Sequence, residues 1–402
     1  MKLQYFLRKI REVKGRDLLS FFRLSAAEIC KPFFMNEFAG EKFWVICEDG
    51  KEARDNGYWF FRYMRENHPE QKVYYAIDFH SPDYEKVKKL GPCVRYGSVR
   101  HWFLYLSAQY NISSQKGGKP DAAVCAFLEL NNMINSRLVF LQHGVCINRP
   151  GWMKADVTQL DYLVTSARPE YEDIVRNFGY PKDKILLTGM PRFDDLHDIR
   201  VKRNQILIVP TWRAWLTLHA EKASEQKFLS SEYMQKWIEL LNSSEIDILM
   251  EKYHLDIIFL MHRNMYPYVE DIRKRIRPGI RVPGWMECDV HEMMKQSQMM
   301  ITDYSSVFFD MVYMKKPVVF YQFDHDRFVS DHYQAGWFDY RNNPFGRSFE
   351  RYDDVLSETE RIILRKYIPS EAYLRAHEEC FPLYDMANSE RIFQMISGIK
   401  EG

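Results

Sequence analysis

The sequence predicts an α/β protein built from two doubly wound, Rossmann-like domains that face each other across a cleft. Short apolar runs alternate with helix-like stretches, and this alternation is typical of parallel sheets covered by helices. It stops at the polar stretch 196–204, the best candidate for a linker, and then starts again. With 402 residues, of which 46% are hydrophobic, the chain can bury a core in each domain.

The first series of elements precedes the linker. Each of its predicted strands is a short apolar run, and in order they are FWVIC at 43–47, KVYYAID at 72–78, QYNISS at 109–114, RLVFLQHG at 137–144 and DYLVTS at 161–166. The alternation then continues through PEYEDIVRNFG at 169–179 and KILLTGMPRFD at 184–194. Helix-like stretches such as RDNGYWFFRYMREN separate these runs. The order predicts strand–helix–strand units, and therefore a parallel sheet.

The second series follows the linker and repeats the pattern. Its predicted strands are QILIVPTWR at 205–213, LDIIFLMHRN at 255–264, IRVPG at 280–284, MMITDYSS at 299–306 and PVVFYQFD at 317–324. From residue 353 onward the chain is predicted to be helical. We therefore expect a leader at 1–40, an N-terminal domain at 41–200 and a C-terminal domain with terminal helices at 201–402.

Composition excludes several classes of protein. Lys and Arg number 56 against 55 Asp and Glu, so a net charge of +1 gives no overall field that would recruit nucleic acid. The seven cysteines are scattered, without the spacing of a zinc site, which indicates a reducing compartment. No apolar run is long enough to span a bilayer and no signal peptide is recognisable, so we expect a cytoplasmic protein.

The leader combines apolar residues at helical spacing with basic residues between them. The apolar positions are Leu3, Phe6, Leu7, Ile10 and Val13. A basic amphipathic helix of this kind can lie on an anionic membrane surface, here through residues 1–31. It can equally pack on its own domain, and the sequence leaves both alternatives open.

A pair of serines stands between a strand-like and a helix-like run in ITDYSSVFFDMVYM. Asp303, Ser305 and Ser306 occupy the predicted turn, and the serines lie near the start of the helix. Because the first N–H groups of a helix lack partners within it, this is a favourable place for a phosphate group. The simpler interpretation is an ordinary serine cap.

Other polar residues follow predicted strands, where ligands bind in open α/β sheets. In the first domain His143 has a pKa suited to general-base catalysis, and Gly144 allows close approach of a ligand. In the second domain the candidates are Arg213, His262, Arg263, Asp324 and Asp326. The basic residues suit phosphate oxygens, although Arg213 could instead pair with a carboxylate and His262 could cap a helix. The aspartates could hold ribose hydroxyls or Mg²⁺.

Three common catalytic patterns are missing. The sequence contains neither a phosphate-binding G-x-x-x-x-G-K-[ST] loop nor a G-x-G-x-x-G after its first strand. It also lacks the G-x-S-x-G elbow of hydrolases. These absences argue against P-loop nucleotidases, dinucleotide oxidoreductases and α/β-hydrolases.

Taken together, the motifs resemble those of the CDP-glycerol glycerophosphotransferase family, whose members prime or extend teichoic acids and related phosphate-linked capsules. The matching segments, in order, are LQHG, TGMPRFDDL, ILIVPTWR, FLMHRN, ITDYSSVFFDMVYMKKPVVFY and AGWFDYRNNPFG. The resemblance covers roughly residues 43–396. It implies a GT-B fold, with an acceptor-binding N-terminal domain and a C-terminal domain that holds the CDP-linked donor.

The resemblance also implies roles for residues. Ser305 and Ser306, with His262 and Arg213, would contact the donor pyrophosphate, and Asp303 would orient their turn. His143 would act as base on the acceptor hydroxyl. Because many relatives have W-H-G-T-P where this chain has QHGVC, the nature of the acceptor stays open.

The function that this resemblance implies is transfer of glycerol phosphate, or ribitol phosphate, from a CDP-alditol with release of CMP. The acceptor would be a hydroxyl of a lipid-linked chain or polysaccharide, at the inner face of the cell membrane, in teichoic-acid or capsule synthesis. No cofactor is certain, and Mg²⁺ stays open. The alternatives are a GT-B glycosyltransferase that uses a nucleotide sugar, and a scaffold protein without catalytic activity.

Overall fold

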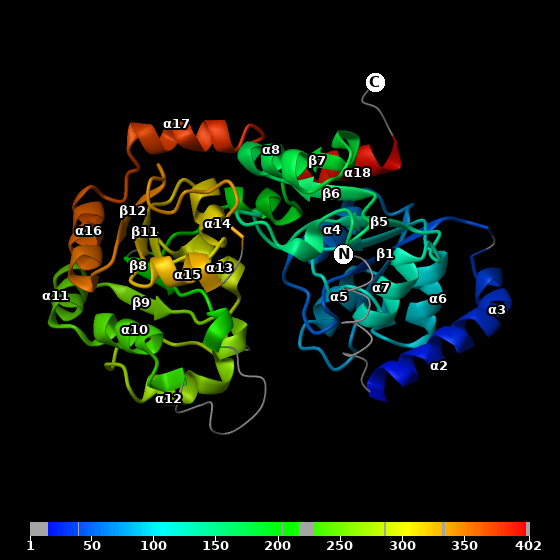
Figure 1. The fold of residues 1–402 in the computed structure, drawn as a ribbon, viewed down its shortest axis with the longest axis horizontal. Coiled ribbons are helices and arrows are strands. Elements are labelled where there is room, and N and C mark those ends of the chain that lie inside the picture. The colour runs from blue at the N-terminus through cyan, green and yellow to red at the C-terminus, as the bar shows by residue number, and fades with distance from the viewer. Residues whose placement is uncertain are drawn as a thin grey trace. The chain divides into compact units, whose positions relative to one another are not determined.

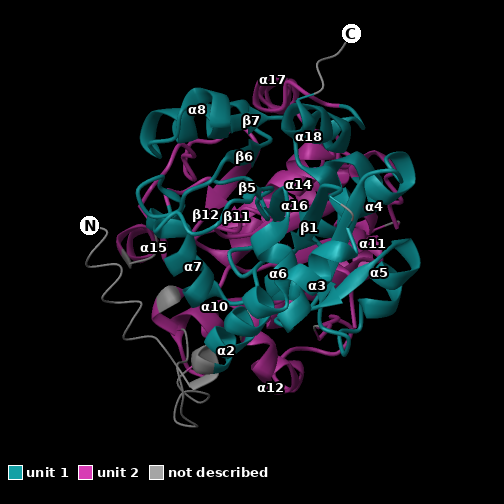
Figure 2. Cartoon of the chain, turned by 90° about the vertical axis from the view of Figure 1, so that its right-hand side faces the viewer, with its two compact units in different colours: residues 1–146, 150–195, 385–402 teal, residues 147–149, 196–384 magenta. Residues whose placement is uncertain are grey.

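The chain forms two compact units, which are coloured separately in Figure 2. Our computed structural model describes residues 15–38, 40–202, 204–216, 228–284, 287–331 and 334–398 (Figure 1). Unit 1 comprises residues 1–146, 150–195 and 385–402, and unit 2 comprises 147–149 and 196–384. Residues 1–14 of the predicted leader, which contain its apolar positions from Leu3 to Val13, lie outside the described residues.

Unit 1 contains a seven-stranded parallel sheet in the order β3-β2-β1-β4-β5-β6-β7. The strands are β1 (Phe43–Cys47), β2 (Lys72–Ile77), β3 (Cys93–Arg95), β4 (Tyr110–Ser113), β5 (Arg137–Phe140), β6 (Tyr162–Thr165) and β7 (Ile185–Leu187). The helices are α2 (Gly15–Ile29), α3 (Lys31–Asn36), α4 (Asn56–Asn67), α5 (Tyr84–Leu90), α6 (Val99–Ser107), α7 (Ala122–Leu130), α8 (Arg168–Asn177) and α18 (Asn388–Ser397). The strand order reverses direction between β1 and β4, which makes the end of these two strands the switch point of the sheet.

Unit 2 contains a five-stranded parallel sheet in the order β12-β11-β10-β8-β9. The strands are β8 (Gln205–Val209), β9 (Asp256–Phe259), β10 (Met299–Thr302), β11 (Val318–Tyr321) and β12 (Gly346–Phe349). The helices are α10 (Glu232–Asn242), α11 (Ser244–Tyr253), α12 (Val269–Arg273), α13 (Val290–Gln296), α14 (Phe308–Tyr313), α15 (His325–Asp331), α16 (Tyr352–Leu364) and α17 (Glu371–Cys380). Its switch point lies between β8 and β10, with β9 on the far side of β8.

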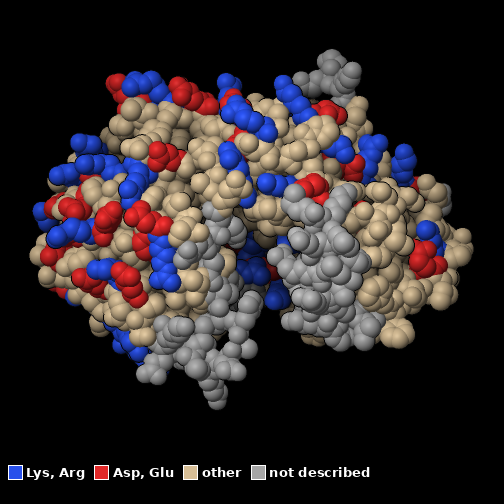
Figure 3. All heavy atoms as spheres, viewed as in Figure 1, with Lys and Arg blue, Asp and Glu red and all other residues tan. Residues whose placement is uncertain are grey.

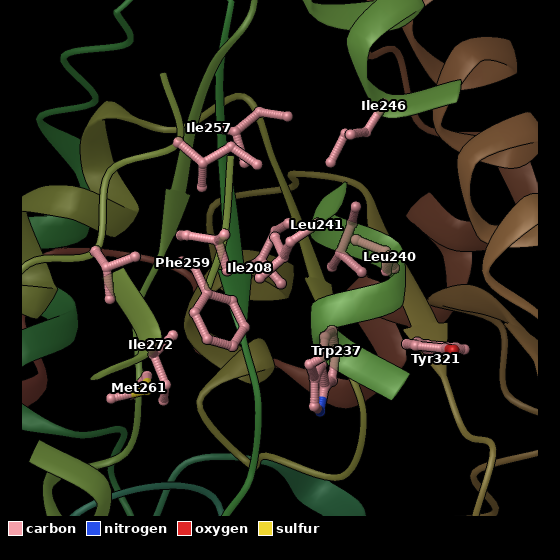
Figure 4. Close-up of a cluster of buried hydrophobic side chains, with 14 of the residues drawn as sticks. Ile208, Trp237, Leu240, Leu241, Ile246, Ile257, Phe259, Met261, Ile272 and Tyr321 are labelled. Carbon is pink, nitrogen blue, oxygen red and sulfur yellow. The ribbon is translucent and has the colours of Figure 1, made fainter. Parts of the chain in front are cut away.

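The strands form where the apolar runs predicted them because both faces of these sheets are covered. All five side chains of β1 are buried, as are all four of β10 and β11. In unit 2, Trp237 of α10 packs against the sheet, with ring centroids 5.9 Å from Phe259 and 5.2 Å from Tyr321 (Figure 4). The predicted strand IRVPG is the exception, since only Arg281 forms an isolated bridge, to Ile258.

The last helix, α18, belongs to unit 1 rather than to the predicted C-terminal domain. Asp194 fixes its start, because the carboxylate accepts hydrogen bonds from the backbone N–H of Asn388 at 2.8 Å and of Ser389 at 2.9 Å. Its apolar face enters the core of unit 1, where Ile392 is fully buried and Phe393 lies 5.9 Å from Trp44 between ring centroids.

A buried histidine in α6 predicts acid sensitivity of unit 1. Burial lowers the pKa of His101 to about 3, from an ordinary value of 6.5, and its Nδ1 accepts a hydrogen bond from Gly97 N at 3.0 Å. Between these two pH values the unfolded chain binds a proton that the folded chain excludes. The free energy of unfolding should therefore fall as the pH drops from 6.5 toward 3, by up to about 5 kcal/mol.

Denaturant unfolding of a His101→Asn variant at several pH values tests this expectation. The Asn Oδ1 can accept the bond from Gly97 but does not titrate in this range. The variant should lose part of the wild-type pH dependence, whereas His254→Asn, at an exposed position with a positive φ that Asn tolerates, should keep all of it. Equal pH dependence in all three proteins would contradict the assignment to His101.

The surface is mixed in charge, with basic and acidic side chains interspersed in Figure 3. Three large apolar side chains on α2 and α3 are strongly exposed, namely Phe22 at 74%, Ile29 at 79% and Phe33 at 77%. Within the described part of the chain, no helix is both long enough and apolar enough to cross a bilayer.

Candidate active site

The turn after β10 is tied to both neighbouring strands of unit 2. Asp303 is fully buried, and its Oδ1 accepts hydrogen bonds from Thr211 N at 2.7 Å and from Tyr304 N at 2.6 Å. Gln322, after β11, donates through Nε2 to the carbonyl oxygen of Asp303 at 2.9 Å. Three strand-end loops that are far apart in sequence thus converge on one residue, Asp303.

Arg213 is the centre of this arrangement, and its side chain is buried. Its Nε and Nη2 donate to Asp324 Oδ2 and Oδ1 at 2.7 and 2.9 Å, while Nη1 donates to Thr211 O at 2.8 Å. The same Nη1 lies 2.8 Å from Asp303 Oδ2. Although burial opposes the charge, Asp303 and Asp324 together raise the pKa of Arg213 above its ordinary value.

This geometry differs from the substrate contacts expected of Arg213 and Asp324, whereas Asp303 binds the backbone of its own turn. The three charges are directed at one another, because a buried guanidinium and buried carboxylates are stable only when paired. The carboxylate pairing that the sequence left open for Arg213 is the one observed. These residues therefore hold the loops after β8, β10 and β11 in place.

Ser305 and Ser306 lie next to this network and are half-buried. Ser305 Oγ accepts a weak hydrogen bond from Val307 N at 3.4 Å, and α14 begins only at Phe308. The helix is therefore shorter than the apolar run predicted, and the serines form the turn before it. Their hydroxyls are near the helix start, as expected.

The loop after β9 places His262 and Arg263 in unit 2. His262 is half-buried, and its ring centroid lies 5.9 Å from that of Trp212, which precedes Arg213. Arg263 is exposed. The loops after β8 and β9 are thus in contact, which extends the cluster of polar strand ends.

The pair Asp324 and Asp326 does not fit a magnesium ion in this arrangement. Both carboxylate oxygens of Asp324 accept from Arg213, and Asp326 is exposed with Oδ1 3.3 Å from Arg341. Elsewhere in the described chain, no group of three or more His, Cys, Asp or Glu residues has the arrangement of a metal site. We assign no metal to these residues.

The candidate base His143 lies in unit 1, where its loop is held rigidly. His143 is exposed, whereas its neighbours Gln142 and Gly144 are buried, and Gln142 has a positive φ of 59°. Gln142 Nε2 donates to Val164 O at 2.7 Å and to Glu170 Oε1 at 3.0 Å. Buried Glu170 also accepts from the backbone N–H of Cys146 at 2.6 Å, and so fixes both sides of the histidine.

Two further residues support this loop and were not singled out from the sequence. Arg192 Nη1 donates to the carbonyl oxygen of His143 at 3.0 Å and lies 3.1 Å from Asp55 Oδ1. Asn56 is fully buried, and its Nδ2 donates to Gln142 O at 2.8 Å. Arg192 lies in TGMPRFDDL and Asn56 in RDNGYWFFRYMREN, two segments that the sequence analysis named. Nothing in those segments indicated that these two residues would support the loop of His143.

Comparison with known protein families shows which family the chain belongs to. The family model described as CDP-Glycerol:Poly(glycerophosphate) glycerophosphotransferase matches residues 31–398. The chain belongs to this family. The match includes residues of both units and all ten candidate site residues named from the sequence.

Curated relatives of this glycerophosphotransferase family include proteins of teichoic acid synthesis. The chain is 29% identical over 364 residues to the minor teichoic acid biosynthesis protein GgaB of Bacillus subtilis, covering 88% of this chain and 39% of that protein. It is 26% identical over 262 residues to a teichoic acid glycerol-phosphate transferase of Staphylococcus aureus, covering 60% of this chain and 62% of that protein. The chain therefore spans about two fifths of the length of the first of these relatives.

Solved structures of the wall teichoic acid polymerase TagF have the same fold as this family member. One matches with a TM-score of 0.64 at 17% identity, covering 98% of this chain and 99% of that chain. A UDP-GlcNAc 2-epimerase from Neisseria meningitidis matches with a TM-score of 0.53 at 11% identity, covering 89% of this chain and 100% of that one. The likeness to TagF confirms the predicted GT-B class.

Proposed function

We propose that this chain transfers glycerol phosphate, or alternatively ribitol phosphate, from a CDP-alditol to a hydroxyl of a polyol-phosphate or glycan acceptor. The observation that carries the proposal is the family match over residues 31–398, in a chain whose polar strand-end loops converge in unit 2. The relatives named for glycerol-phosphate and ribitol-phosphate transfer support the choice of donor. The product besides the extended acceptor is CMP.

The chemical step requires a proton acceptor and neutralised phosphates. The acceptor oxygen attacks the phosphorus that carries the alditol, the bond from this phosphorus to the bridging oxygen breaks, and CMP leaves with that oxygen. We assign the acceptor proton to His143, because its exposed side chain stands on a loop fixed by Glu170 and Arg192. Positioning and charge neutralisation supply most of the remaining catalysis in phosphoryl transfer.

We assign donor binding to unit 2. Ser305 and Ser306 offer hydroxyl groups beside the turn, and His262 and Arg263 offer donors from the neighbouring loop. The buried network around Arg213 acts indirectly, by holding these loops at a fixed distance from one another. His262 would stabilise the negative charge that develops on the leaving CMP.

The products formed from different donors test the function. The full chain is incubated separately with CDP-glycerol, CDP-ribitol and common nucleotide sugars, together with a poly(glycerol phosphate) acceptor. Acceptor-dependent CMP release from a CDP-alditol is the expected result. Release of a nucleoside diphosphate from a nucleotide sugar would instead support the glycosyltransferase alternative. If none of the donors reacted, the scaffold alternative would be favoured.

We also propose that the chain binds anionic membranes through its N-terminal helices. The exposed side chains of Phe22, Ile29 and Phe33 on α2 and α3 support this, because apolar side chains beside basic ones insert at a lipid interface. α2 is held on unit 1 by Arg23, whose Nη1 donates to Gly97 O at 3.1 Å. A peripheral location at the inner face of the cell membrane would follow.

Liposome flotation measures this binding. A triple Phe22→Ser, Ile29→Ser, Phe33→Ser variant should lose flotation with vesicles that contain anionic lipid. A variant with Leu364→Ser and Ile368→Ser removes exposed apolar side chains from unit 2 and should float like wild type. Loss of flotation in both variants, or in neither, would contradict a site on α2 and α3.

A further inference from the structure

Unit 1 contains a cavity that none of the proposed catalytic or donor-binding residues lines. It has a volume of about 80 Å³ and lies among α7, the strands β4 and β5, and the segment 152–160. Every residue that lines it belongs to unit 1. A volume of this size holds roughly five to eight water-sized groups, which is about the size of a small polyol.

One wall of the cavity is an aromatic platform with a cation beside it. Phe140 and Trp152 meet edge to face, with ring centroids 5.7 Å apart, and Trp152 is half-buried. Lys116 Nζ lies 5.3 Å from the centroid of the Trp152 ring. Aromatic faces bind the C–H surface of a carbon skeleton, and an ammonium group next to them attracts an anionic substituent. The wall therefore suits a molecule with a carbon backbone and a phosphate.

Asn111 also lines the cavity, and it carries a polar atom to which a hydroxyl group could donate a hydrogen bond. Asn111 is only 6% exposed, and its Nδ2 donates to Tyr105 O at 2.7 Å. Among the described residues, none donates a hydrogen bond to its Oδ1. A buried acceptor without a donor is unfavourable, so an apolar occupant such as a lipid tail fits this wall less well than a polyol.

The carboxylate of Glu129, which lines the cavity, does not exclude a phosphate group from it. Glu129 is buried on α7, and both of its oxygens lie within 2.8 Å of Lys119 Nζ. Its charge is therefore compensated inside the wall. Lys116 also lines the cavity, and its exposed ammonium group adds a positive charge to the wall beside Trp152.

The cavity is connected to the loop of the proposed base. The lining residue Gln115 donates through Nε2 to Asp55 Oδ2 at 2.7 Å, and Asp55 Oδ1 lies 3.1 Å from Arg192, which holds the carbonyl of His143. Gln115 and Asp55 lie in the loops after β4 and β1, the switch point of this sheet, where ligands of doubly wound sheets bind.

From this geometry we infer that the cavity is an acceptor subsite for an alditol-phosphate unit. The alditol carbons lie on Trp152, one hydroxyl is directed at Asn111, and the phosphate faces Lys116. Because His143 does not line the cavity, the unit held there is not the one that reacts, and the reacting hydroxyl belongs to a later unit of the same acceptor. The inference rests on the proposed function for the identity of the acceptor.

Direct binding and kinetics test the subsite. The probe is a synthetic tri(glycerol phosphate), titrated calorimetrically into the full chain without donor. Lys116→Gln and Trp152→Leu should each weaken binding, and raise the acceptor KM, by about tenfold or more, with kcat and the KM for CDP-glycerol unchanged. Lys88→Gln is the matched control, since Lys88 Nζ also lies 5.3 Å from an aromatic centroid, that of Tyr84, on the exposed α5.

The outcomes separate this inference from the proposed function. Wild-type binding that both cavity variants retain, or no binding by wild type, overturns the subsite. Weaker binding in the cavity variants but not in Lys88→Gln supports it, whether or not CMP is released. Absence of CMP release with oligomer binding intact overturns only the proposed transfer reaction. Tight binding of an alkyl chain in place of the oligomer would overturn the subsite in favour of a lipid pocket.

Discussion

Replacing His143 with alanine is expected to lower the rate of phosphoalditol transfer by about 10²- to 10⁴-fold, while the affinity for CDP-glycerol stays unchanged. His143 is exposed on a loop of unit 1, so its removal deletes the proton acceptor and leaves every residue that we assign to donor binding in place. Acceptor-dependent CMP release gives kcat, and calorimetry with CDP-glycerol gives the donor Kd.

The complementary variant, Ser305→Ala with Ser306→Ala, should show the reverse pattern. Loss of two hydroxyl contacts to phosphate oxygens raises the donor Kd by about tenfold or more. His80→Ala serves as a control on unit 1, because His80 is an exposed histidine far in sequence from the site. Equal loss of donor affinity in the His143 and serine variants would overturn the division of roles between the units.

Replacing Arg213 with alanine should destabilise unit 2 by about 3–5 kcal/mol, because it leaves the carboxylates of Asp303 and Asp324 buried without their cation. Native-state hydrogen exchange of the β8 and β10 amides reports this loss locally. Arg213→Lys should recover only part of it, since an ammonium cannot form the two parallel bonds that the guanidinium forms with Asp324.

The control for this change is Arg263→Ala, which removes an exposed arginine from the next loop of the same unit. Its effect on the free energy of unfolding should stay within about 0.5 kcal/mol. If Arg213→Ala left exchange of β8 and β10 unchanged but abolished donor binding, Arg213 would be a substrate ligand, as the sequence had suggested.

The sheets were predictable because many of their strands are short, continuous runs of apolar residues. Runs such as FWVIC and MMIT are apolar on both faces, which only a strand covered on both sides requires. β3 and β12 were not identified, because they are short strands whose side chains are mostly not buried. The sequence pattern also could not predict that α18 packs on unit 1. An amphipathic period tells which face of a helix is apolar but not which sheet that face covers.

The candidate site was predictable as a set of loops but not as a set of contacts. A polar residue after a strand is visible in the sequence, and this identified Arg213, Asp303 and Asp324. Their mutual pairing was not visible, because Arg213 and Asp324 are 111 residues apart. For the same reason the sequence did not show that Asn56 and Arg192 both hold the loop of His143, because these two residues are 136 positions apart in the chain.

The return of α18 to unit 1 has a consequence for synthesis on the ribosome. The helix that packs on the core of unit 1 at Trp44 and α4 is translated only after the whole of residues 196–384. At about 5–20 residues per second, unit 1 waits roughly 10 to 40 s with this apolar surface uncovered. Unit 2, which needs no later segment, can complete its core first, although it begins second.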